Sequence, residues 1–168
     1  MKSVKLKRVV FLDRDGVINR RRRDYVKSLE EFEILPGAVE AIARLSSQRR
    51  VIVLTNQSAI GRGLVPFETV LAMHSRLAEL VAEAGGKIDG FVICPHTPSD
   101  GCSCRKPAPG LFYRARDELG ADLAGAVMVG DQPSDAEAAQ AAGLKALLVG
   151  PEGDYAGLPE ATDAILDS

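Results

Sequence analysis

Two aspartates, Asp13 and Asp15, stand two residues apart at the end of the apolar run Val9–Leu12. A run of this kind is typical of a strand that is buried on both faces in a parallel sheet. Two carboxylates at its exit repel each other and lose water, so a cation would stabilise them, and Mg²⁺ prefers oxygen ligands. The alternative is an acidic turn with Gly16 as the breaker, because such turns are common after strands. The pair alone leaves both interpretations open.

Lysine, a hydroxyl, an amide and further carboxylates elsewhere in the chain supply the other groups that phosphoryl transfer needs. An aspartate can attack phosphorus and form an aspartyl-phosphate, and a second carboxylate two residues on can move the proton. Thr55 and Asn56 can donate hydrogen bonds to phosphoryl oxygens, and Lys106 can place a positive charge on them. Asp131 could complete a Mg²⁺ site, and Asp135 could orient the ligands of that site without binding the ion itself.

The elements that must position these groups follow from an alternation of short apolar runs with helical patterns, which predicts an α/β fold. We expect a parallel sheet with helices on both faces. The expected strands are Val9–Leu12, Val51–Leu54, Phe91–Ile93, Ala126–Val129 and Ala146–Val149. The expected helices run from about Pro36 to Ser46, Pro66 to Gly85, Pro109 to Leu119 and Pro133 to Ala142. His74 falls outside the apolar stripe of the second helix, and we expect it at the surface or its boundary.

Polar residues follow four of these strands, and ligands of open α/β sheets bind beyond the carboxyl ends of strands. The residues are Asp13 and Asp15, Thr55 to Ser58, Cys94 to His96, and Asp131 with Asp135. Their convergence at one edge of the sheet favours a functional site over a set of unrelated turns.

Composition and length are those of an ordinary soluble domain. The 168 residues are 46% hydrophobic and 26% charged, with a formal net charge of −2. We therefore expect a single domain over residues 1–168, with no global positive charge to attract nucleic acid. No apolar stretch reaches the ~18 residues of a membrane helix. Three cysteines and the absence of a signal-peptide pattern predict a cytoplasmic protein, and we expect a monomer with no membrane partner.

Four motifs together resemble the haloacid dehalogenase (HAD) superfamily of phosphatases. They are Asp13-Arg14-Asp15-Gly16, Thr55-Asn56, Lys106-Pro107, and Gly130-Asp131 with Asp135. The resemblance implies a Rossmann-like fold with Asp13 as nucleophile and Asp15 as general acid and base. It implies Mg²⁺ held by Asp13, the backbone carbonyl of Asp15 and Asp131, and a phosphoryl group bound by Thr55 and Lys106. No insertion is long enough for a separate cap domain, so we expect short loops to close the site.

All three cysteines and one of the two histidines fall within eleven residues, as Cys94, His96, Cys102 and Cys104. Three cysteines and one histidine are a recurring ligand set of structural zinc. The alternatives are scattered buried thiols beside a surface histidine and, less favoured, a catalytic Cys–His pair. Zinc would order the loop from Thr97 to Ser103 and thereby present the following basic residues to a phosphate.

This loop is similar to the zinc loop of the D-glycero-D-manno-heptose 1,7-bisphosphate 7-phosphatases, and histidinol-phosphate phosphatases carry a related one. The segments Thr55 to Gly63 and Tyr25-Val26 favour the heptose family. That resemblance implies removal of the 7-phosphate of a small phosphorylated sugar, in the synthesis of nucleotide-activated heptose for lipopolysaccharide. It implies substrate contacts from Asp24, Tyr25, Asn56, Gln57, Ser58, Arg62, Arg105 and Lys106.

Three features depart from the heptose pattern. Ala59 stands where those enzymes usually have glycine, Gln132 where many have lysine, and Arg20 to Arg23 replaces a less basic stretch. The arginine run is interpreted either as a solvated loop or as a contact to a second phosphate, with nucleic-acid binding a weak third. Two other functions stay open. One is a histidinol-phosphate or other sugar-phosphate phosphatase on the same scaffold, and the other is a non-catalytic phosphate-binding module.

Overall fold

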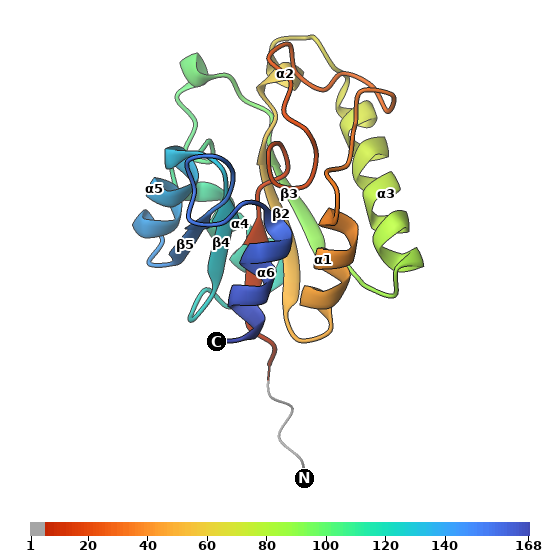
Figure 1. Ribbon diagram of the computed structural model, residues 1–168. Coiled ribbons are helices and arrows are strands. Elements are labelled where there is room, and N and C mark those ends of the chain that lie inside the picture. The colour runs from red at the N-terminus through yellow and green to blue at the C-terminus, as the bar shows by residue number, and fades with distance from the viewer. Residues whose placement is uncertain (1–5) are drawn as a thin grey trace.

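Five parallel strands form one sheet in the order β3-β2-β1-β4-β5 in the computed structural model, which describes residues 6–168 (Figure 1). The strands are β1 (Val9–Leu12), β2 (Arg50–Asn56), β3 (Gly90–Cys94), β4 (Val127–Gly130) and β5 (Lys145–Leu148). The central strand β1 pairs with β2 and β4, so that Val10 lies opposite Val51 on one side and Val127 on the other. The strand that leads to the two aspartates is therefore held on both edges.

Helices cover both faces of this sheet. On one face lie α1 (Ala38–Ser46), α3 (Phe67–Glu83) and α6 (Leu158–Leu166), and on the other lie α4 (Gly110–Leu119) and α5 (Pro133–Ala141). A short helix, α2 (Ser58–Gly61), follows β2 directly, and a single 3₁₀ turn spans Pro98–Asp100. The predicted α/β architecture with helices on both faces is confirmed. In the described part of the chain no helix has the length and apolar character needed to cross a membrane.

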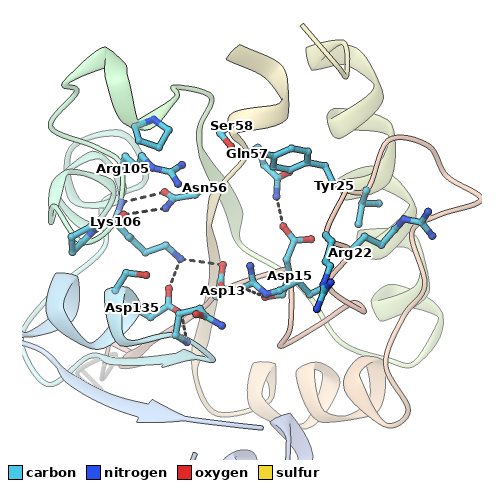
Figure 2. A pocket seen from close by; sticks show the side chains of 17 residues that line it. Asp13, Asp15, Arg22, Tyr25, Asn56, Gln57, Ser58, Arg105, Lys106 and Asp135 are labelled. Carbon is cyan, nitrogen blue, oxygen red and sulfur yellow. Dashed lines mark hydrogen bonds and ion pairs between the residues drawn. The ribbon is translucent and has the colours of Figure 1, made fainter. Parts of the chain in front are cut away.

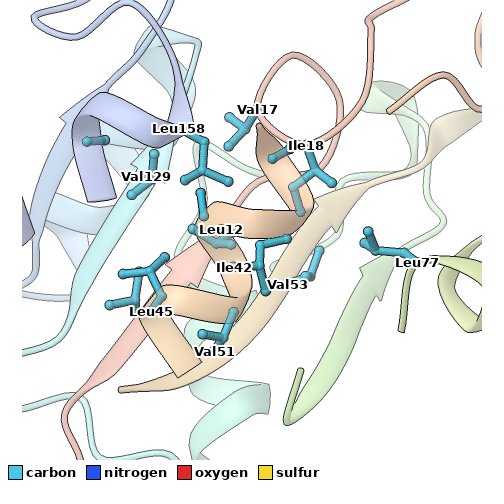
Figure 3. Close-up of a cluster of buried hydrophobic side chains, with 14 of the residues drawn as sticks. Leu12, Val17, Ile18, Ile42, Leu45, Val51, Val53, Leu77, Val129 and Leu158 are labelled. Carbon is cyan, nitrogen blue, oxygen red and sulfur yellow. The ribbon is translucent and has the colours of Figure 1, made fainter. Parts of the chain in front are cut away.

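Alternating side chains of β1 seal both layers of the core. Leu12 packs with Ile42 and Leu45 of α1 on one face (Figure 3). Phe11 points to the opposite face, where its ring meets Phe112 of α4 edge-on at 5.1 Å between centroids. Successive residues of a strand point to opposite faces, so four residues suffice to anchor it in both layers. One further backbone hydrogen bond, from Asp13 N to Val129 O at 2.9 Å, fixes the backbone of the first aspartate against β4.

The five expected strands and four expected helices are present, and none of their ends is more than two residues from the expected position. The sequence did not predict α2, α6 or the 3₁₀ turn. The expectation for His74 is wrong: this side chain is buried, with 3% of its surface exposed. Helix α3 is covered on that side by the loop after β1 and by Phe91 of β3, whose ring stacks on the imidazole at 4.4 Å.

Candidate active site

Asp13 and Asp15 leave β1 in separate environments (Figure 2). The Asp13 carboxylate accepts hydrogen bonds from Lys106 Nζ at 3.0 Å and from the Arg14 backbone N at 2.9 Å. The Asp15 carboxylate accepts from Arg14 Nη2 at 2.8 Å, from Asn19 Nδ2 at 2.9 Å and from Gln57 Nε2 at 2.8 Å. Each carboxylate thus has a cation of its own.

These surroundings move the two acidities in opposite directions. Burial raises the pKa of Asp13 to about 7, although the Lys106 ammonium opposes the rise. Burial would also raise the pKa of Asp15, but the Arg14 guanidinium and hydrogen bonds from Asn19 and Gln57 hold it below its ordinary value. In this structure Asp13 is therefore the weaker acid of the two carboxylates and Asp15 the stronger.

Lys106 is the buried centre of the site. Its ammonium contacts Asp13 Oδ1 at 3.0 Å, Asp135 Oδ1 at 2.6 Å and the Leu54 carbonyl oxygen at 3.2 Å, which satisfies its three donors. Burial would lower the pKa of Lys106, but the carboxylates of Asp13 and Asp135 raise it above its ordinary value. Asn56 holds the Lys106 backbone from β2, with its amide bonded to both the N–H and the carbonyl at 3.2 and 3.3 Å.

The loop after β1 and the loop after β4 approach each other closely. Asp135 Oδ2 accepts from the backbone N–H groups of Asp131 and Gln132 at 3.1 Å each, at the start of α5. A Cβ at Gly130 would overlap the Asp135 side chain, and a Cβ at Gly16, where φ is +86°, would overlap the Asp131 carboxylate. Glycine is required at both positions because the acidic side chains fill the space.

Carboxylate oxygens of Asp13, Asp131 and Asp135 lie within 4.8 Å of one another. Arg21 Nη2 donates to Asp131 Oδ1 at 2.9 Å and to the Asp15 carbonyl oxygen at 3.2 Å. This guanidinium therefore sits on two of the three groups expected to hold a cation. An all-oxygen donor set that draws in a positive group fits a hard divalent ion such as Mg²⁺.

The cysteine and histidine cluster is drawn together. Cys94 Sγ lies 3.0 Å from Cys104 Sγ and 3.7 Å from Cys102 Sγ, and His96 Nδ1 lies 3.2 Å from Cys104 Sγ. The cysteines are free, and the four donor atoms all lie within 4.8 Å of one another. Tetrahedral zinc with bonds of ~2.3 Å to sulfur places its sulfur ligands roughly 3.8 Å apart. The separation of Cys94 and Cys102 matches this value, whereas that of Cys94 and Cys104 is shorter. The donor set is that of a closed metal site beside the loop that carries Arg105 and Lys106.

A cavity of about 620 Å³ opens above the two aspartates. Acidic side chains (Asp13, Asp15, Asp135) and basic side chains (Arg21, Arg22, Arg23, Arg105, Lys106) both line it. Arg105 Nη1 is buried and has no hydrogen-bond partner among residues 6–168, which leaves a charged donor available to an anion. Arg23 also lines the cavity and makes no ion pair with the described residues. The cavity thus offers positive charge from side chains other than Lys106.

Most of the predicted catalytic, substrate-binding and magnesium-binding residues line this cavity, and four do not. The lining members are Asp13, Asp15, Tyr25, Asn56, Gln57, Ser58, Arg105, Lys106 and Asp135. Thr55 is fully buried, and its hydroxyl accepts from Gln57 Nε2 at 2.8 Å. Asp24 and Arg62 are exposed outside the cavity, with Asp24 paired to Lys27 at 2.8 Å. Asp131, which accepts from Arg21, does not line the cavity either. Substrate contact stays a prediction for all of these residues.

Arg14, Arg21 and His74 contribute to the site without having been predicted from the sequence. Arg14 carries a local signal, since a basic residue between two aspartates has a carboxylate within reach on either side. Arg21 stood out only as part of a basic run, and nothing in the sequence around His74 indicates that its ring reaches the first motif.

The model of the haloacid dehalogenase-like hydrolases matches residues 4–143 of the chain. The chain belongs to this family of hydrolases, and its fold is the Rossmann-like fold expected for it.

Relatives with specific names share much of the sequence. A D-glycero-beta-D-manno-heptose-1,7-bisphosphate 7-phosphatase of Pseudomonas aeruginosa is 49% identical over 142 residues, 84% of this chain and 80% of the relative. The alpha-anomer 7-phosphatase of Mycobacterium tuberculosis is 43% identical over 136 residues, 77% of this chain and 70% of the relative. The crystal structure of a D,D-heptose 1,7-bisphosphate phosphatase from B. bronchiseptica, complexed with magnesium and phosphate, superposes with a TM-score of 0.88 at 38% identity. That superposition covers 95% of this chain and 98% of the other.

Lys106→Met should destabilise the protein by about 3 kcal/mol, because it leaves two buried carboxylates facing each other without a cation. Urea unfolding at neutral pH measures the change. The matched control is Lys87→Met, at a side chain that is 77% exposed, which should change stability by less than about 0.5 kcal/mol. Equal stabilities of the two variants would show that the buried ion cluster does not hold these loops.

Proposed function

We propose that this hydrolase is a Mg²⁺-dependent phosphatase that removes the 7-phosphate of D-glycero-D-manno-heptose 1,7-bisphosphate. One observation carries the proposal: Asp13 and Lys106 meet at 3.0 Å in a cavity whose other basic side chains come from a separate arginine segment and from Arg105. A bisphosphate offers one phosphate to the carboxylate and lysine and a second to the arginines. The names of the relatives support the same substrate.

In the proposed reaction the Asp13 carboxylate attacks phosphorus and the bond from phosphorus to the sugar oxygen breaks. Asp15 gives its proton to the leaving oxygen. Water then attacks the aspartyl-phosphate and loses a proton to Asp15, which releases inorganic phosphate and restores Asp13. Lys106 keeps Asp13 oriented and its charge balances the phosphoryl oxygens in the transition state.

Asp13, the Asp15 carbonyl oxygen and Asp131 would hold Mg²⁺, with Asp135 bracing the loop of Asp131 through two backbone N–H groups. The bound ion would neutralise negative charge on the phosphoryl group and on the carboxylates around it. Arg21 occupies part of this donor set, so it must withdraw when the ion binds. Withdrawal would leave Arg21 beside Arg22 and Arg23 at the cavity, close to a second phosphate.

We further propose zinc at Cys94, His96, Cys102 and Cys104, as a structural ion that orders the loop before Lys106. The proposed groups gather at one edge of one sheet, which supports a single-domain enzyme, and we propose that it acts as a monomer. Free cysteines suit a reducing compartment such as the cytoplasm.

A substrate panel tests the proposed function. With Mg²⁺, the purified chain should hydrolyse at least one of the two heptose 1,7-bisphosphate anomers faster than it hydrolyses histidinol phosphate or simple sugar phosphates. Asp13→Asn should lower kcat by about a thousandfold or more, because the amide is a poor nucleophile. The control is Asp163→Asn, which changes a surface aspartate paired with Arg44. Preference for histidinol phosphate would overturn the substrate, and no turnover of any phosphomonoester would overturn the phosphatase itself.

Metal analysis tests the zinc site. Wild-type protein purified without chelator should carry about one zinc per chain. Cys102→Ser should lose most of it and lower kcat/KM, because the unpinned loop no longer holds Arg105 and Lys106. Ser103→Ala changes the neighbouring residue of the same loop without touching the four donors and should keep its zinc. Wild-type protein with almost no zinc would contradict the assignment.

Arg21→Gln should bind Mg²⁺ about fivefold more tightly than the wild type in the absence of substrate, because no guanidinium competes for Asp131. Isothermal titration calorimetry measures the affinity. Arg20→Gln is the matched control, since Arg20 pairs with Glu33 at 3.1 Å and should leave Mg²⁺ affinity unchanged. Equal or weaker binding by Arg21→Gln would show that Arg21 does not compete with the ion.

A further inference from the structure

Arg14 is a charged side chain with no exposed surface. Its Nε and Nη2 atoms donate to Asp15 Oδ1 at 3.2 and 2.8 Å, and its guanidinium carbon lies 5.2 Å from the centre of the Phe32 ring. A buried guanidinium is costly unless each of its edges meets an acceptor. The Asp15 carboxylate satisfies one edge of Arg14, which leaves Nη1 on the far side to be accommodated.

Nη1 of Arg14 faces α3, where it lies 3.4 Å from His74 Nε2 and 3.7 Å from Met73 Sδ. Arginine can only donate, so Nε2 must accept with its lone pair, and the neutral ring must carry its proton on Nδ1. Burial and the positive charge of Arg14 lower the pKa of His74 to about 3, which keeps the ring neutral. His74 is thus an acceptor for a buried cation.

The other ring nitrogen shows that this placement is not favoured by packing alone. His74 Nδ1 is buried and has no hydrogen-bond partner among residues 6–168. An unsatisfied buried donor destabilises a protein, and a phenylalanine could stack on Phe91 without such a donor. The benefit of histidine here lies in Nε2 and its contact with Arg14.

This chain of contacts makes the two oxygens of Asp15 unequal. Oδ1 accepts from Arg14 and Asn19 Nδ2, whereas among residues 6–168 Oδ2 accepts only from Gln57 Nε2, at 2.8 Å. Asp15 also lines the cavity, so an oxygen with spare acceptor capacity is within reach of a bound substrate. We propose that Arg14 and His74 are positioning residues that fix the plane of the Asp15 carboxylate, so that Oδ2 is the atom that exchanges the proton. The inference rests on the proposed role of Asp15 in phosphate transfer.

Two variants at position 74 separate this role from packing. His74→Phe keeps the ring that stacks on Phe91 and removes the acceptor, whereas His74→Gln places an amide oxygen at about the reach of Nε2. With the substrate that wild type hydrolyses, His74→Phe should lower kcat about tenfold with KM within about twofold, because proton transfer depends on the placement of Asp15. His74→Gln should recover most of kcat. Arg76→Gln, at an exposed residue of the same helix, is the control.

Equal kcat values for His74→Phe and His74→Gln, whether high or low, would overturn the positioning role. Ring ¹⁵N NMR of the wild type at neutral pH gives an independent test that needs no activity and no folded variant. The chain has two histidines, which makes assignment direct. A protonated Nδ1 with an unprotonated Nε2 is expected for His74, and the opposite tautomer or a charged ring would overturn the proposal. A wild type that hydrolyses no phosphomonoester would refute the proposed function and leave this contact to be judged by NMR.

Discussion

The ammonium group of Lys106 is the contact on which the site depends. It is buried between Asp13 after β1 and Asp135 at the start of α5, so three segments that are far apart in the sequence must meet there. A buried charge without partners would cost several kcal/mol, so a loop that withdrew its carboxylate would leave a charge uncompensated. The demand for compensation therefore selects a single arrangement of these loops. Asn56 on β2 makes that arrangement more exact by holding the lysine backbone.

The requirement that a buried charge be compensated applies a second time, at the guanidinium of Arg14. The Asp15 carboxylate pairs with Arg14, and the neutral ring of His74 accepts a hydrogen bond from the far side of that guanidinium, so these contacts connect the loop after β1 to α3. Two neighbouring carboxylates consequently keep separate partners and separate acidities. The Lys106 ammonium is the cation beside Asp13, and the Arg14 guanidinium is the cation beside Asp15.

The sequence predicted the sheet and most helices because their signals are local. Apolar runs such as Val9–Leu12 mark buried strands, and proline before an apolar stripe marks a helix start. Helix α2 has four residues, Ser58–Gly61, which is too few to show a period. Helix α6 follows a segment rich in glycine that hid its beginning, although Leu158 and Ile165 face the core. The expected convergence of polar residues beyond the strands is present, because parallel strands that end at one edge bring their loops together.

Residue types, their order and their spacing determined by themselves that acidic, basic and thiol groups would gather at one edge of a parallel sheet. The cysteine cluster lies within one short loop, so its members could be predicted from the sequence. Only the tertiary structure decided which cation serves which carboxylate, that Arg21 lies on the expected ion ligands, and that His74 is buried against Arg14. These pairings join residues up to 110 positions apart, and they depend on burial, which sequence spacing does not encode.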